Sequence, residues 1–109
     1  LSIEGNSIFV VDNNSNIYAL DRRNGVELWS QGSLKSRSVT AATPVGEHIV
    51  VGDNWGFVHW IEQETGQIVA RVDVGGDDED DAIYDAPLNV DGVVVTMTRN
   101  GVVAAISTL

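Results

Sequence analysis

The sequence contains no cysteine, a single methionine and only 6 lysine or arginine residues among 109. The absence of cysteine excludes a disulfide scaffold, thiolate zinc sites, iron–sulfur clusters and a cysteine nucleophile. Against 16 acidic residues the few basic ones leave a formal net charge of −10, which disfavours nucleic acids and anionic lipid surfaces as partners. No apolar run approaches the roughly 18 residues of a membrane-spanning helix. The 43% of hydrophobic residues instead indicates one folded domain.

The chain carries an internal repeat. A shift of 41 residues pairs Asp12 with Asp53 and Gly25 with Gly66, and eight positions match in all without a gap. A shift of 45 residues reveals a third copy after an acidic stretch. A period near 41 residues occurs both in β-propeller blades and in helical repeats, so the local pattern must decide between them.

The local pattern indicates β-strands. Short stretches rich in branched apolar residues, such as 49–51, 57–61 and 102–106, are separated by turn residues, and Asn100-Gly101 is a strong hairpin signal. Some runs, such as 93–95, are apolar throughout. Continuous apolar strands are covered on both faces, which is expected where the blades of a propeller stack on one another.

We therefore predict an all-β partial propeller, a single domain over residues 1–109, with about two and a half four-stranded antiparallel blades. The expected pieces are 1–38 with three strands, 39–74 with four and 82–109 with three, ten strands in total, with an acidic loop at 75–81. Closed propellers have about four to eight blades, so we expect this chain to be part of a larger ring. The first residue, Leu1, also favours a processed or partial chain.

Residues 19–29, Ala-Leu-Asp-Arg-Arg-Asn-Gly-Val-Glu-Leu-Trp, resemble the tryptophan-docking motif of quinoprotein-type (PQQ-like) propellers. The second copy keeps Gly66 but has Trp60 in place of the small residue and Ala70 in place of the indole, so the two sizes have exchanged positions. The resemblance implies that the motif residues lock one blade to the next. In this sequence they are Ala19, Asp21, Gly25, Trp29 and Gly66.

Within these propellers, residues 52–61 are similar to the penultimate blade of the BamB family, lipoproteins of the outer-membrane β-barrel assembly complex. The resemblance implies a C-terminal fragment of an eight-bladed ring, anchored to the periplasmic side of the outer membrane by a lipid outside this sequence. It further implies a non-catalytic scaffold without a cofactor. Such a scaffold binds the POTRA domains of the barrel subunit, mainly through blades absent here, and assists insertion of outer-membrane proteins.

A blade segment of a quinone-cofactor (PQQ) dehydrogenase is the alternative function. Resemblance to those enzymes implies pyrroloquinoline quinone and calcium on the propeller axis, commonly beneath a pair of adjacent cysteines. This sequence contains neither such a pair of cysteines nor a converging group of a catalytic base and calcium ligands, although another part of the ring could supply them. The upstream sequence would distinguish the two functions.

Few individual residues predict chemistry. The seven acidic residues within 73–85 lack the spacing of a calcium loop, so we expect a solvated loop. His48 and His59 lie on different predicted strands with no carboxylate at ligand spacing, which favours structural roles. We predict no catalytic, cofactor-binding or metal-binding residue. Trp55, at a hairpin tip, is a candidate partner contact, with packing onto an adjoining loop as the alternative.

The incomplete ring predicts one further property. Blade faces and strand edges that neighbours would cover are left open, so we expect the isolated chain to self-associate.

Overall fold

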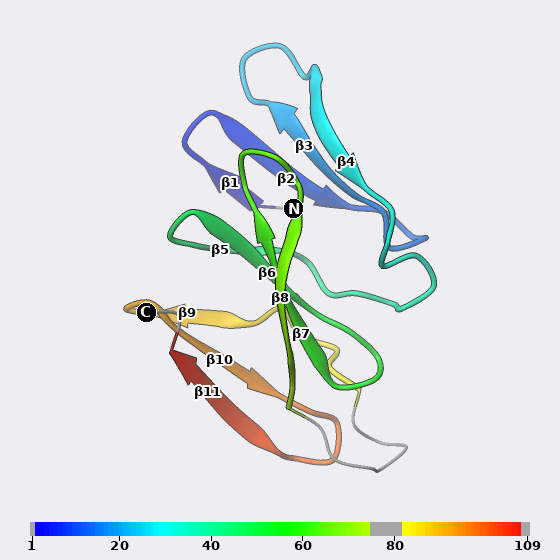
Figure 1. The fold of residues 1–109 in the computed structure, drawn as a ribbon, viewed down its shortest axis with the longest axis vertical. Helices are drawn as coiled ribbons and strands as arrows, with labels where there is room; N and C mark the ends of the chain where they lie inside the picture. Colours follow the sequence, from blue (N-terminus) through cyan, green and yellow to red (C-terminus); the bar gives the residue numbers. More distant parts are fainter. Residues whose placement is uncertain (1, 75–81, 108–109) are drawn as a thin grey trace.

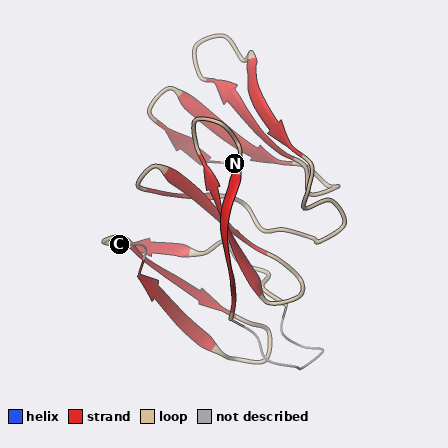
Figure 2. Cartoon of the chain, in the orientation of Figure 1, coloured by secondary structure: helices blue, strands red, loops and turns tan. Residues whose placement is uncertain are grey.

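The computed structural model describes residues 2–74 and 82–107, and every regular element within these ranges is a β-strand (Figure 2). The strands form three antiparallel sheets in sequence order. The first sheet contains β1 (Ser2–Glu4), β2 (Ser7–Val11), β3 (Ile17–Asp21) and β4 (Glu27–Gln31). The second contains β5 (Thr43–Val45), β6 (His48–Gly52), β7 (Phe57–Glu62) and β8 (Ile68–Asp73), and the third contains β9 (Leu88–Val90), β10 (Val93–Met97) and β11 (Val103–Ser107).

The three sheets follow one another along the long axis of the molecule (Figure 1). Each is a meander in which consecutive strands pair, and the turns β2–β3, β6–β7 and β10–β11 lie on the same side of the stack, at the right in Figure 1. This arrangement confirms the predicted all-β partial propeller. The strand count was wrong by one, because the first repeat contains the additional strand β1. That strand has three residues with a single large apolar side chain, Ile3, so no sequence periodicity could reveal it.

The second sheet forms the centre of the stack and is covered on both faces. Along β6 the side chains alternate: Ile49 and Val51 belong to a core shared with the first sheet, whereas Val50 belongs to a core shared with the third. Strand β7 divides in the same way, with Ile61 on the first side and Trp60 on the second. A strand buried on both faces reads as a continuous apolar run, as predicted.

The outer sheets are covered on one face only. In β2 only Phe9 is buried, and in β10 the valines flanking Val94 are half-buried. The prediction that run 93–95 is covered on both faces is therefore wrong for the described part of the chain. The reason is position, since the first and third sheets each have only one neighbouring sheet.

Candidate functional site: the blade-docking contact and an arginine–aromatic turn

The first and second sheets are joined by a tryptophan seated on a glycine. Trp29 on β4 is 9% exposed, and its indole N–H donates a 2.7 Å hydrogen bond to the carbonyl oxygen of Gln63 in the β7–β8 turn. Gly66 of that turn has φ +78°, and a Cβ built there would lie 2.5 Å from Cδ2 and Cε3 of the indole. Gln31 Nε2 donates a second hydrogen bond to the Gly66 carbonyl, at 2.8 Å. Glycine is thus required at 66 both for its φ and for the close approach of the ring.

The other residues of the predicted motif lie within the first sheet. Ala19 on β3 stands opposite Trp29, and a bulge follows it. Asp21 accepts hydrogen bonds from the backbone and the guanidinium of Arg23, which lower the pKa of Asp21 below its ordinary value. Gly25, at φ +72°, has no atom of the described chain within 4 Å of a built Cβ. The structure therefore brings Trp29 and Gly66 together across two sheets, while Asp21 and Gly25 shape the β3–β4 turn. That all five residues lock blades together remains a prediction.

The exchanged residues of the second repeat lie between the second and third sheets. Trp60 on β7 is 6% exposed and packs in the second core, and Ala70 on β8 stands opposite it. A hollow of about 260 Å³ borders both residues and reaches Ile106 on β11. The contact between these sheets therefore differs from the one that Trp29 makes.

A buried carboxylate organises the turn between β6 and β7. Asp53 is fully buried, and its Oδ1 accepts hydrogen bonds from the backbone N–H groups of Trp55 and Phe57, at 2.9 and 3.0 Å. Its Oδ2 lies 2.8 Å from His59 Nε2 and 3.1 Å from Arg37 Nη1. An ionised carboxylate can only accept hydrogen bonds, so Nε2 of His59 carries the proton in this pair.

These contacts set the direction in which the pKa of Asp53 is shifted. Burial by itself raises the pKa of Asp53, but the hydrogen bonds from His59, Phe57 and Trp55 outweigh it and hold the pKa below the ordinary value. The sequence showed no carboxylate at ligand spacing from His59, but β7 returns the ring beside Asp53, six residues earlier in the chain. Its role in this geometry is structural, since ring and carboxylate are both sealed from solvent.

The guanidinium of Arg37 connects this buried acid to the surface. Arg37 lies in the connection between the first two sheets, and its Cζ is 4.5 Å from the centre of the Trp55 ring. Trp55 itself is 56% exposed. Trp55 therefore makes the contact with an adjoining loop that was the alternative prediction for it, and more than half of its side chain stays accessible.

Asp53 and Arg37 were not among the site residues predicted from the sequence. The repeat carried a signal for the former, because Asp12 occupies the matching position and makes matching contacts. Asp12 Oδ1 accepts the N–H groups of Asn14 and Asn16, and Tyr18, which corresponds to His59, donates to Oδ2 at 3.1 Å. No repeat signal could reveal Arg37, which has no counterpart of the same type.

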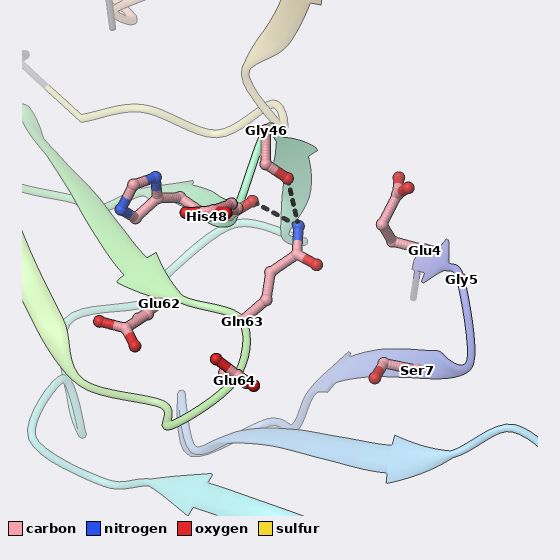
Figure 3. A pocket seen from close by; sticks show the side chains of 9 residues that line it. Glu4, Gly5, Ser7, Gly46, His48, Glu62, Gln63 and Glu64 are labelled. Atoms are coloured by element: carbon pink, nitrogen blue, oxygen red, sulfur yellow. Dashed lines mark hydrogen bonds between the residues drawn. The ribbon is translucent and has the colours of Figure 1, made fainter.

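The side of the stack opposite the β6–β7 turn carries acidic side chains. A hollow of about 570 Å³ opens between the first two sheets, and on its second-sheet wall Gln63 donates to the carbonyls of Gly46 and His48, at 3.1 and 2.8 Å (Figure 3). Four glutamates also line it: Glu4, Glu47, Glu62 and Glu64. Within residues 2–74 and 82–107, no three acidic or histidine side chains converge as a metal site. The predicted acidic loop, 75–81, lies outside the described residues.

Among the residues that the structure describes, no helix has the length and hydropathy needed to cross a membrane.

Known proteins are similar to this chain in both sequence and fold. A family model described as outer membrane protein assembly factor BamB matches residues 2–109. The protein of that name from Shewanella oneidensis is 37% identical over 107 residues, covering 98% of this chain and 26% of the relative. The one from Escherichia coli is 33% identical over 105 residues, covering 96% and 26%. The chain thus spans about a quarter of the length of these relatives.

Solved structures agree with the architecture. BamB from Moraxella catarrhalis superposes with a TM-score of 0.82 at 26% identity, over 93% of this chain and 29% of that one. A quinohemoprotein alcohol dehydrogenase from Pseudomonas putida HK5 gives a TM-score of 0.76 at 25% identity, over 88% and 16%. The family model covers nearly every residue and agrees with the relatives by name. The chain belongs to the BamB family of outer membrane protein assembly factors.

Proposed function

We propose that this chain is a blade segment of a non-catalytic scaffold in outer-membrane β-barrel protein assembly. The scaffold acts on the periplasmic side of the outer membrane, where a lipid outside this sequence anchors it. It binds POTRA domains of the barrel subunit, mainly through other blades, and assists insertion of outer-membrane proteins. The observation that carries this proposal is the match of residues 2–109 to a family of outer membrane protein assembly factors.

The buried polar cluster supports a structural use of its acid and histidine. Asp53 and the His59 side chain are 0% and 3% exposed, and both carboxylate oxygens already accept hydrogen bonds. A general base must reach a substrate proton directly or through one water molecule. In this geometry the pair holds a turn together and is closed to a substrate.

A chimera tests the proposal. This chain replaces the matching quarter of the E. coli relative, and the chimera is expressed in cells that lack their own assembly factor. We expect normal amounts of folded outer-membrane barrel proteins and capture of purified POTRA domains. A chimera that is soluble and resists proteolysis, yet restores neither property, would overturn the proposed function.

The dehydrogenase alternative rests on the likeness to the quinohemoprotein enzyme, which covers 16% of that chain. It predicts that the intact parent protein binds pyrroloquinoline quinone with calcium. Equilibrium dialysis with the quinone, measured by its absorbance, distinguishes the two functions. Retention of the quinone would favour the enzyme.

A further inference from the structure

Arginines and aromatic rings alternate along the β6–β7 end of the second sheet. The Cζ of Arg37 lies 4.5 Å from the centre of the Trp55 ring and 5.7 Å from that of Phe57. On β8 the Cζ of Arg71 lies 4.7 Å from the centre of the Phe57 ring. We call these four residues, Trp55, Arg37, Phe57 and Arg71, the ladder.

Two members of the ladder, Arg37 and the backbone of Trp55, are held in place by the buried Asp53. Asp53 holds Arg37 through an ion pair at 3.1 Å and holds the backbone of Trp55 through its N–H group, at 2.9 Å. The Arg37 carbonyl also accepts a hydrogen bond from Asn54 N–H, at 3.0 Å. An exposed indole held in this way loses little conformational freedom on binding, and tryptophan and arginine are the side chains most enriched in binding hot spots.

The fold itself does not require tryptophan at this turn. The equivalent residues of the first and third repeats are Asn14 and Asn100, and all three turns close with the same strand-end hydrogen bond between backbone N–H and C=O groups. Asparagine suits a tight turn, whereas a large aromatic ring that is 56% exposed buries little apolar surface there and stabilises the fold little. The turn can therefore form without tryptophan at position 55, and the needs of the turn do not explain this residue.

Arg71 supplies the charge that a partner would meet. Its side chain is exposed, and within the described part of the chain its guanidinium stacks on the Phe57 ring and makes no hydrogen bond or ion pair. The charge of Arg37 is largely matched by Asp53. A carboxylate fits the planar fork of Arg71, and because the chain is strongly acidic overall, a short segment with one carboxylate fits better than a polyanion.

We propose that the ladder binds an extended segment of a partner protein in which an acidic side chain lies about four residues from an aromatic one. The successive distances along the ladder place the Arg71 guanidinium within about 15 Å of the Trp55 ring, and extended chain advances roughly 3.4 Å per residue, so about four residues span it. Side chains four residues apart in a strand point to the same side. The carboxylate meets Arg71 and the aromatic ring meets Trp55. This inference rests on the proposed role as an interaction module.

A peptide titration tests it directly. The probe is the synthetic peptide Gly-Ser-Glu-Ser-Gly-Ser-Phe-Gly-Ser, with versions carrying Lys for Glu or Ser for Phe. Binding to the 109-residue chain is followed by the backbone amide NMR signals of residues 54–57. We expect the parent peptide to bind at least fivefold more tightly than either version.

Variants of the chain assign the contact. Trp55→Asn introduces the residue that the other two repeats already carry, so the turn is preserved, and Arg71→Gln removes the charge. Each should weaken binding at least fivefold. Tyr84→Asn is the matched control, because Tyr84 is 63% exposed and stacks on Arg99 outside the ladder, and it should leave binding unchanged. Equal binding by Trp55→Asn and the unaltered chain, or equal binding of all three peptides, would overturn the inference.

The chimera separates this inference from the proposed function. A chimera that fails without any substitution counts against the proposed function itself. A chimera that works, and works equally well with Trp55→Asn, counts against the ladder as a contact surface and leaves the proposed function standing.

Discussion

Replacing Gly66 with alanine tests whether the contact between the Trp29 indole and Gly66 holds the first two sheets together. The matched control is Gly25→Ala, because both glycines occupy the same turn of successive repeats, at φ +78° and +72°. An alanine at either position adopts the left-handed conformation, which costs about 1–2 kcal/mol, partly offset by the reduced freedom of the unfolded chain. Gly25→Ala should therefore lower the free energy of unfolding by about 1 kcal/mol.

At Gly66 two further costs arise. The new Cβ would lie 2.5 Å from two carbons of the indole, and overpacking of this kind costs about 1–3 kcal/mol. An indole that moves away weakens its 2.7 Å hydrogen bond to Gln63, worth about 1 kcal/mol. We therefore expect Gly66→Ala to lower the free energy of unfolding by about 3–5 kcal/mol.

Urea unfolding followed by tryptophan fluorescence measures both variants. Trp29→Ala should cost about 3–5 kcal/mol by itself. In that background Gly66→Ala should cost no more than Gly25→Ala, because the ring with which the methyl group clashes is gone. Equal losses for the two glycine variants, or strictly additive losses for Gly66→Ala and Trp29→Ala, would refute the reasoning.

The remaining predictions concern the buried acid and the open face of the stack. Asp53→Ala should lower the free energy of unfolding by about 3–5 kcal/mol, because it leaves the Arg37 guanidinium and the buried His59 ring without their carboxylate partner. Asp12→Ala should cost less, and thermal unfolding of both variants tests this. The pKa of Asp53 is lower in the folded chain than the ordinary 3.8, so its stabilising effect is complete above that pH and fades as the pH falls further. The deficit of Asp53→Ala in urea midpoints should accordingly shrink below pH 3.8, and a constant deficit would contradict the assignment. The isolated chain should self-associate through an apolar face of the third sheet, and Val103→Lys should yield a monomer in sedimentation; a monomer at all concentrations without the substitution would count against this. That face includes Leu88, Met97 and Val103.

The architecture could be predicted from the sequence, because the repeat indicates the length of a blade and the branched apolar residues indicate the strands. It could not reveal β1, whose three residues pair with β2 but bury no side chain fully. Nor could it indicate which continuous apolar strands are buried on both faces, since that depends on the number of neighbouring sheets. The same apolar pattern is fully buried in β6 from Ile49 to Gly52 and largely half-buried in β2.

The candidate site was predicted only where it follows the motif. Trp29 and Gly66 stand 37 positions apart, and the resemblance named both as blade-docking residues without pairing them with each other. The cluster around Asp53 could not be inferred from the sequence. Arg37 lies in a connection without regular structure, 16 positions before the acid that it contacts. Long side chains on such connections leave no periodic trace in a sequence.

Comparison among the repeats separates what the fold needs from what it only tolerates. At the end of the second strand of each repeat stand Asp12, Asp53 and Thr98, and each accepts hydrogen bonds from the turn that follows. A side-chain acceptor at that position is therefore a requirement of the hairpin. Two residues further on the repeats diverge, and only the second carries an exposed aromatic ring, Trp55. Because neighbouring repeats close the same turn with asparagine, exchanging the ring for asparagine isolates binding from folding.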